Sequence, residues 1–310
     1  ETGEGDRTVA HEQKRKVEKL LLNIFLIGII SIRLRREQTI MDESMSELEK
    51  EAFAGSTDAQ CQLGDWYFFS AEENEEQAYV KAAYWYSMAA HHGDVIGQYN
   101  LAYQYEHALG IAADAAKAVY WYQCAARQEY GPAENNLGHL YETGWGVPQD
   151  YEKALYWYQR AGLHGNADGQ CNTGIMYQFG YTGEPDYSKA AYWYHKGAEQ
   201  GSFIAQNNLG YLYEMGWGVA KDEQQAAVWY EKAALAGDGP AQNNLGQLYR
   251  DGRGVPQDLT QAVYWFSLSA AAGYIEGMKN LAHAYAAGEG VAPNEELAAY
   301  WQQLAQQRQQ

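Results

Sequence analysis

A 16-residue stretch that returns at a fixed interval constrains this fold more than any other feature of the chain. Asn207–Asp222 reads NNLGYLYEMGWGVAKD. Close copies lie 72 residues before it, at Asn135–Asp150, and 36 residues after it, at Asn243–Asp258. A chain that keeps such a period is usually built from stacked copies of one supersecondary unit. The sequence therefore predicts a repeat array and leaves the function open.

The repeat extends over most of the chain. The pattern A-x-x-x-L-G-x-x-Y, with Ala or Gly at its first position, begins near residues 59, 97, 133, 169, 205, 241 and 277. A tryptophan recurs every 36 residues, at Trp85, Trp121, Trp157, Trp193, Trp229, Trp265 and Trp301. An aromatic residue on an alanine-flanked helical stripe usually belongs to the core, so we expect these tryptophans to be buried.

Each unit is predicted to be a pair of helices. In the unit that starts at Ala133, Leu137 follows at the spacing of one helix face. Gly138 lowers helix propensity there, which indicates close approach of another helix. Gly144 is expected to end the first helix, and Asp150 to cap the second. No unit can bury its apolar stripe alone, so we predict an all-α superhelical solenoid of about seven 36-residue helix-turn-helix repeats.

Composition excludes several classes of function. The formal net charge of −18 argues against nucleic acid or an anionic membrane as partner, since both attract an excess of Lys and Arg. Cys61 and Cys171 occupy the same place in units three apart, and with Cys124 they do not make a disulfide framework. The chain contains no H-E-x-x-H, C-x-x-C, G-x-S-x-G, S-x-x-K or Walker motif. We therefore expect no catalytic residue, no metal site, no cofactor and no enzyme.

Residues 1–40 are a separate basic and apolar segment. Leu20–Ile32 is a 13-residue apolar run with Lys and Arg on both sides, too short to span a bilayer comfortably. It fits a signal or membrane anchor, although no small-x-small cleavage site follows directly, or it is a non-native extension before a start at Met41. Membrane association is expected only if residues 20–32 are native and retained. The protein would be cytoplasmic with a start at Met41, and periplasmic or secreted if residues 14–32 are a signal.

The next segment, residues 41–58, is predicted to be an N-terminal capping helix. Ser46 and Glu49 have the spacing of a capping box at its start. Residues 59–310 then hold the repeats.

Two adjoining stretches carry a family resemblance. Ala205–Asp222, AQNNLGYLYEMGWGVAKD, is followed by Ala226–Gly237, AAVWYEKAALAG. They resemble the Sel1-like repeat family, relatives of the tetratricopeptide repeat, and the resemblance extends from residue 59 to the C-terminus. It implies a right-handed superhelix that acts as an interaction scaffold, and the near-consensus repeats indicate a bacterial source. The fourth unit departs from the pattern, with Thr173 for the family leucine and a distorted turn at Phe179–Asp186.

The predicted binding surface is the face of each first helix opposite its apolar stripe. At about 100° per residue, Asn135, His139 and Glu142 lie about 140–200° from Leu137, and in tetratricopeptide relatives this face lines a concave groove. Tyrosine supplies contact area at low entropic cost, and glutamate favours a basic or hydrogen-bond-rich partner. The alternative is an ordinary polar surface exposed to solvent. The predicted groove residues are Tyr99, Tyr103, Glu106, Asn135, His139, Glu142, Asn207, Tyr211, Glu214, Asn243, Gln247 and Arg250.

Two further sets of residues leave alternatives open. Trp145 and Trp217 lie in Gly-x-Gly turns, where they either anchor a partner at the edge of the array or pack locally. An asparagine occupies one position in six consecutive units, at the border of the buried stripe. It either ties neighbouring helices together or clamps a peptide along the groove. The series is Asn100, Asn136, Asn172, Asn208, Asn244 and Asn280.

Together these features predict a non-enzymatic adaptor or scaffold that binds a protein or an extended peptide, with a basic partner favoured, in its concave groove. One alternative is a secreted or periplasmic recognition protein that binds glycan or cell-envelope fragments. A hydrolase-like activity is the third alternative.

Overall fold

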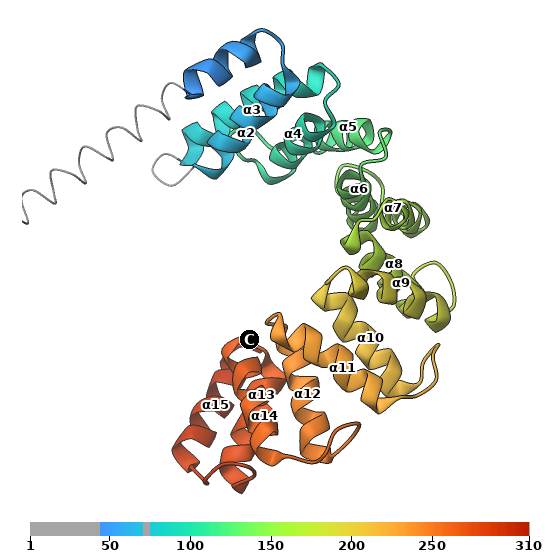
Figure 1. The fold of residues 1–310 in the computed structure, drawn as a ribbon, viewed down its shortest axis with the longest axis vertical. Helices are drawn as coiled ribbons and strands as arrows, with labels where there is room; N and C mark the ends of the chain where they lie inside the picture. The colour runs from blue at the N-terminus through green and yellow to red at the C-terminus, as the bar shows by residue number, and fades with distance from the viewer. Residues whose placement is uncertain (1–43, 71–74, 310) are drawn as a thin grey trace, which may run out of the picture. The chain divides into compact units, whose positions relative to one another are not determined.

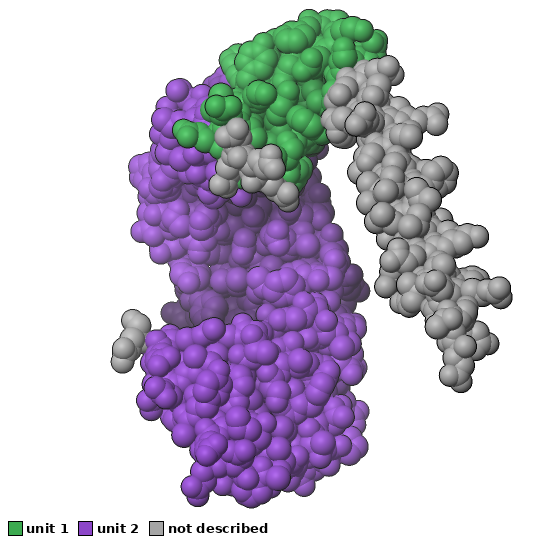
Figure 2. All heavy atoms as spheres, turned by 90° about the vertical axis from the view of Figure 1, so that its left-hand side faces the viewer, with its two compact units in different colours: residues 1–97 green, residues 98–310 purple. Residues whose placement is uncertain are grey.

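The computed structural model describes residues 44–70 and 75–309. The predicted N-terminal segment, residues 1–40, lies outside this part of the chain. The chain divides into two compact units, residues 1–97 and residues 98–310 (Figure 2). The first unit contains the first repeat, and the second unit contains the repeats that follow.

Every regular element in the described residues is an α-helix, which confirms the all-α prediction (Figure 1). Residues 44–53 are helical, and helix pairs with short connections follow. Their bounds are α2 Thr57–Phe69, α3 Glu75–His91, α4 Val95–His107, α5 Ala115–Ala126, α6 Gly131–Thr143, α7 Tyr151–Leu163, α8 Ala167–Phe179, α9 Tyr187–Glu199, α10 Phe203–Met215, α11 Glu223–Leu235, α12 Gly239–Asp251, α13 Leu259–Ala271, α14 Ile275–Ala287 and α15 Glu295–Gln307.

In the second unit the first helix of each pair belongs to one layer. Successive helices pack against each other along the chain from α5 to α15. The first helices also contact one another, α6 with α8, α8 with α10, and α12 with α14. The outward sides of these helices therefore form a shared surface, which we call the first-helix face.

A tyrosine, rather than the tryptophan before it, occupies the centre of most helix pairs. Tyr158 of α7 is 1% exposed. A Cβ added to Gly138 of α6 would lie 2.5 Å from Cδ1 of Tyr158, so only glycine lets the ring lie this close to the α6 backbone. The predicted close approach at Gly138 is confirmed. The equivalent tyrosines, all 2% exposed or less, are Tyr86, Tyr122, Tyr194 and Tyr230.

The tryptophans are less uniformly buried than predicted. Trp85, Trp193, Trp229 and Trp265 are 5–8% exposed. Trp121, Trp157 and Trp301 are half-buried. Trp229 belongs to one buried cluster with Ala190 and Tyr194 of the preceding pair. Trp229 thus closes the seam between two pairs.

Helix ends follow the predicted turn chemistry in the third repeat. Gly144 ends α6 with a φ of +77°, and the Asp150 side chain caps α7 by accepting from the Lys153 N–H at 3.0 Å. In the second repeat, two non-glycine residues hold left-handed φ angles, Ala108 at 56° and Glu129 at 61°.

The helix at residues 44–53 packs on the first repeat. Met45 and Leu48 lie against a cluster that includes Ala52 and Trp85. The predicted capping box is wrong, because Ser46 lies inside this helix rather than before its first turn.

Buried side-chain amides join consecutive pairs, a feature that the sequence analysis missed. Gln170 is 5% exposed and donates from Nε2 to the Gly162 carbonyl at 2.9 Å. In the third repeat this position is Glu134, which is fully buried and pairs with Arg160 at 2.9 Å and His164 at 2.6 Å. A charged cluster therefore replaces the amide at one seam.

Candidate binding groove on the first-helix face

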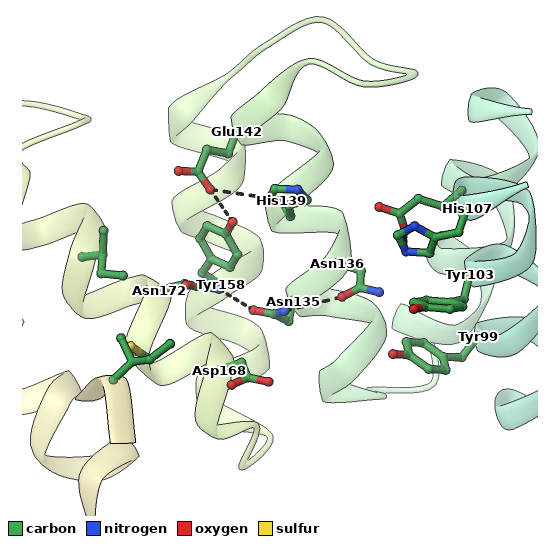
Figure 3. Close-up of a pocket in the computed structure, with 14 residues that line it drawn as sticks. Tyr99, Tyr103, His107, Asn135, Asn136, His139, Glu142, Tyr158, Asp168 and Asn172 are labelled. Atoms are coloured by element: carbon green, nitrogen blue, oxygen red, sulfur yellow. Dashed lines mark hydrogen bonds and ion pairs between the residues drawn. The ribbon is translucent and has the colours of Figure 1, made fainter. Parts of the chain in front are cut away.

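One cavity on the first-helix face brings together residues of consecutive repeats. It has a volume of about 440 Å³ and fourteen lining residues, from α4, α6, α7, α8 and α10 (Figure 3). The predicted groove residues of the second and third units all line it. These are Tyr99, Tyr103, Glu106, Asn135, His139 and Glu142.

The glutamates of the groove are held by the buried tyrosines. Tyr122 Oη donates to Glu106 Oε2 at 2.6 Å, and Tyr158 Oη donates to Glu142 Oε2 at 2.5 Å. Burial and the adjacent carboxylate raise the pKa of both tyrosines far above the usual range, so the hydroxyls remain donors. The carboxylates are less exposed than free rim charges, 14% for Glu106 and 30% for Glu142. They are fixed in place before any partner arrives.

Two histidines border these carboxylates. His107 Nε2 lies 3.9 Å from Glu106 Oε2, and His139 Nδ1 lies 4.0 Å from Glu142 Oε2. The His107 ring also packs on Tyr103, with ring centroids 4.2 Å apart. Figure 3 shows Tyr99, Tyr103 and His107 together on α4, facing Asn135 and His139 of α6.

The asparagine series forms a seam between repeats. Asn172 donates to Asn135 at 2.9 Å, and Asn280 donates to Asn243 at 2.7 Å. Asn243 is only 2% exposed, so the structure does not present this predicted groove residue to a partner. Of the two interpretations of the series, the contacts of these residues fit the tie between neighbouring helices.

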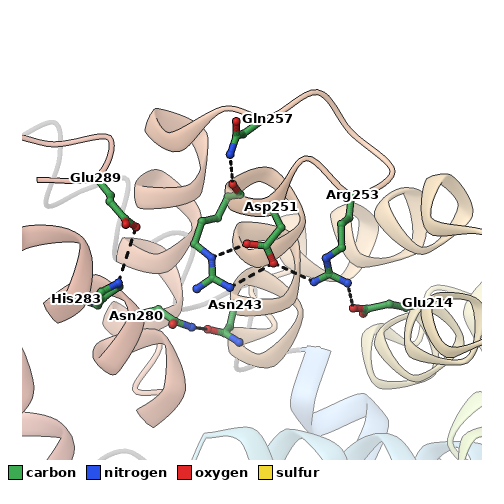
Figure 4. Close-up of polar contacts among 9 residues, drawn as sticks. Glu214, Asn243, Asp251, Arg253, Gln257, Asn280, His283 and Glu289 are labelled. Carbon is green, nitrogen blue, oxygen red and sulfur yellow. Dashed lines mark hydrogen bonds and ion pairs between the residues drawn. The ribbon is translucent and has the colours of Figure 1, made fainter. Parts of the chain in front are cut away.

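The remaining predicted groove residues lie outside the cavity. Glu214 pairs with Arg253 at 2.5 Å, and Arg250 pairs with Asp251 at 2.8 Å (Figure 4). These charges already have partners from the same repeat or the next one. The predicted residues that do not line the cavity are Asn207, Tyr211, Glu214, Asn243, Gln247 and Arg250.

The two turn tryptophans have different surroundings. Trp145 is half-buried and lines a second depression of about 420 Å³ that shares Glu106, His107 and His139 with the first. Trp217 is 38% exposed, and its ring lies 4.8 Å from Tyr187 and 5.5 Å from Tyr211. Local packing against two tyrosine rings thus accounts for much of the surroundings of Trp217. Trp145, by contrast, lines a depression that continues the groove.

The other end of the cavity is formed by residues that were not predicted from the sequence. Cys171 and Ile175 of α8 and Ile204 of α10 line it. Cys171 and Ile175 stand in the fourth unit where Asn135 and His139 stand in the third. Extending the same register to the fourth unit would have found both. Burial raises the pKa of the Cys171 thiol to about 12, and the thiol is not part of a disulfide.

The described residues form neither a metal site nor a membrane span. No group of three or more His, Cys, Asp or Glu in that part of the chain is arranged to hold a metal ion. No helix there is long and apolar enough to cross a membrane. The apolar run at residues 20–32 lies outside the described residues.

Comparison with known proteins identifies the family. The family model of the Sel1 repeat matches residues 57–94, 95–130, 131–166, 167–202, 204–238, 239–274 and 275–305. The chain therefore belongs to the Sel1 repeat family, and its fold is an all-α solenoid of seven repeats. The matched segments begin about two residues before the predicted repeat starts. No curated protein matches the chain.

The chain is similar to a number of solved structures. One is a protective antigen present in uropathogenic Escherichia coli strains, which displays an SLR fold, at 34% identity and a TM-score of 0.76. The alignment covers 85% of this chain and 56% of the antigen, so the chain spans little more than half of that protein. Another is a Sel1 repeat protein from Oxalobacter formigenes, at 30% identity and a TM-score of 0.71, with 79% of this chain and 96% of that chain covered.

Proposed function

We propose that this protein is a non-enzymatic adaptor that binds a segment of a partner protein along the first-helix face, centred on the cavity between α4 and α10. Sel1 repeat proteins are commonly protein-interaction scaffolds. The observation that carries the proposal is the cavity itself, whose lining comes from several consecutive repeats. A surface of this kind suits an extended segment, because such a segment can contact one repeat after another.

The chemistry of the cavity favours a basic partner. Glu106, Glu142 and Asp168 line it, and none of the fourteen lining residues is Lys or Arg. In a chain with a net charge of −18, this adds a local negative potential to an overall acidic protein. A positively charged segment is therefore attracted during encounter as well as in the bound state.

A pull-down with the full chain, followed by binding measurements on the purified partner, tests this function. Tyr103→Ala should weaken binding about tenfold, because it removes aromatic contact area from the wall of the groove on α4. Tyr156→Ala is the matched control, since Tyr156 is 51% exposed on α7 and does not line the cavity.

Two outcomes would reject the proposal. The first is loss of binding with Tyr156→Ala but not with Tyr103→Ala. The second is displacement of the partner by free sugars, which would favour the recognition of glycan fragments.

A further inference from the structure

The groove has two chemically different ends. On α4 and α6 it presents aromatic rings and the carboxylates of Glu106 and Glu142. On α8 and α10 it presents Ile175, Ile204 and the buried Cys171. Ile204 is 47% exposed at the second residue of α10, so an apolar side chain is offered to solvent at this end. Figure 3 shows Asn172 of α8 lying across the cavity from the α4 side chains, with Asn135 and His139 between them.

Each carboxylate at the acidic end keeps one oxygen for a ligand. The Oε2 atoms of Glu106 and Glu142 accept from Tyr122 and Tyr158. No other described residue donates a hydrogen bond to either Oε1. A cationic donor that enters here meets a carboxylate whose position is already fixed, so less side-chain entropy is lost when the pair forms.

We propose that the groove reads two side chains of one extended segment, a Lys or Arg between Glu106 and Glu142 and an aliphatic residue on Ile175 and Ile204. This inference rests on the proposed function and narrows it to a partner chemistry. Neighbouring helices lie about 8–10 Å apart, and an extended residue spans about 3.3 Å. The acidic end, on α4 and α6, and the apolar end, on α8 and α10, lie one to three first helices apart, so the two side chains should be about three to nine residues apart.

A random 12-residue peptide library displayed on phage tests the inference without knowledge of the natural partner. Selection on the full chain should enrich peptides with a Lys or Arg and an aliphatic residue at one preferred spacing. Selection on the Glu106→Gln/Glu142→Gln double variant should lose the basic residue and keep the aliphatic one. Selection on Ile204→Ser should lose the aliphatic residue and keep the basic one.

Binding measurements on synthetic peptides from the selection give the size of the basic residue's contribution to affinity. Replacing their basic residue by Gln should weaken binding to the unaltered protein about tenfold, as expected for two partly exposed ion pairs. The same replacement should change little on the double variant. Gln is tolerated at this position, since Tyr194 donates to Gln178 at 2.6 Å in the fourth repeat. Phe203→Ala is the control for Ile204, because Phe203 is 43% exposed and does not line the cavity.

The failures of the two proposals are distinguishable. If the selected peptides bind at the groove but lack a basic residue, or keep it on the double variant, the two-point inference is overturned and the adaptor function stands. If no peptide is enriched on any version of the protein, both are overturned. Loss of the aliphatic preference with Phe203→Ala instead of Ile204→Ser would move the apolar contact away from the cavity and also overturn the inference.

Discussion

Single residues of the second repeat hold backbone conformations that other repeats assign to glycine. Glu129 has a φ of 61°, and in the third repeat the equivalent position is Gly165 with a φ of +83°. A side chain in the left-handed region crowds its own carbonyl, at a cost of about 1–2 kcal/mol. The second repeat therefore carries a local strain that its neighbours do not.

Glu129→Gly should raise the free energy of unfolding by about 1 kcal/mol, because the relief of this strain exceeds the added entropy of the unfolded chain. Chemical denaturation measures the change. Gly165→Glu is the matched reverse substitution. Nothing lies within 4 Å of a Cβ added at Gly165, so any loss of stability would come from strain in the backbone alone. Equal stability of both variants and the unaltered protein would contradict the explanation.

The hydrogen bond between the buried tyrosine and its acceptor differs from repeat to repeat. Where the fourth repeat has Gln178 as acceptor, Tyr194 still donates to it at 2.6 Å. Where the sixth repeat has Phe266, which has no hydroxyl, Arg250 takes the place of the acceptor and pairs with Asp251. Where it is present, this hydrogen bond is part of the packing within a helix pair, and a partner would use only the atoms that remain accessible.

Glu142→Gln should change the free energy of unfolding by less than about 1 kcal/mol, since an amide oxygen also accepts from Tyr158. Tyr158→Phe should cost about 1.5–3 kcal/mol, the usual contribution of a hydrogen bond to a charged group. Thermal and denaturant unfolding of the two variants compare these losses. A larger loss for Glu142→Gln would show that the charge itself stabilises the pair.

At the scale of the helix, α11 depends on the cap at its start. The Asp222 side chain accepts from the backbone N–H groups of Gln224 and Gln225, both at 3.0 Å. Two of the donors that an α-helix leaves unpaired at its start are satisfied in this way. The cap also fixes where the turn from α10 ends.

Asp222→Ala should destabilise the protein by about 1 kcal/mol, because these two donors lose their acceptor. Asp222→Asn keeps a side-chain oxygen at the same place and should restore most of the loss. Denaturant midpoints measure both. If the Asn variant were as unstable as the Ala variant, the charge and not the hydrogen bond would account for the stability.

The helix pairs, their caps and their period could be predicted because each depends on residues close together in sequence. Gly144 and Asp150 act within one turn of the helix that they end or begin. The first-helix face was predictable by the same local arithmetic, at about 100° per residue. This arithmetic placed the residues from Tyr99 to Glu142 around one cavity.

The parts that sequence reasoning did not predict depend on contacts between distant residues. The hydroxyl of Tyr158, 16 positions after Glu142, takes one carboxylate oxygen. Asn243 is buried and accepts a hydrogen bond from Asn280 of the next repeat, 37 positions away. The repeat period alone does not show which polar side chains are used in such contacts and which remain available to a partner.

Across the whole array, buried tyrosines couple stability to alkaline pH. Burial raises the pKa of Tyr122, Tyr158, Tyr194 and Tyr230 above the usual range, and a neighbouring carboxylate adds to the shift in all but Tyr194. The folded state therefore keeps protons that the unfolded state releases above about pH 10. The contribution is complete below that pH and is lost as the pH rises above it.

Stability should fall steeply above pH 10, by about 1.4 kcal/mol per pH unit for each such tyrosine. Tyr158→Phe should reduce this slope by the contribution of one tyrosine, about 1.4 kcal/mol per pH unit. Denaturant titrations at several pH values between 9 and 11 measure the slope, and ultraviolet absorbance of tyrosinate locates its cause. An unchanged slope in the Phe variant would mean that Tyr158 ionises in the folded state.

The central claim is that the partner lies on the first-helix face at the cavity, and site-specific cross-linking tests it most directly. p-Benzoylphenylalanine is placed at His139, which lines the cavity and is 57% exposed, or at Tyr156 on α7, outside the cavity. The account predicts that the captured partner cross-links on irradiation from position 139 and not from position 156. Cross-linking from position 156 alone would place the partner on the second helices and contradict it.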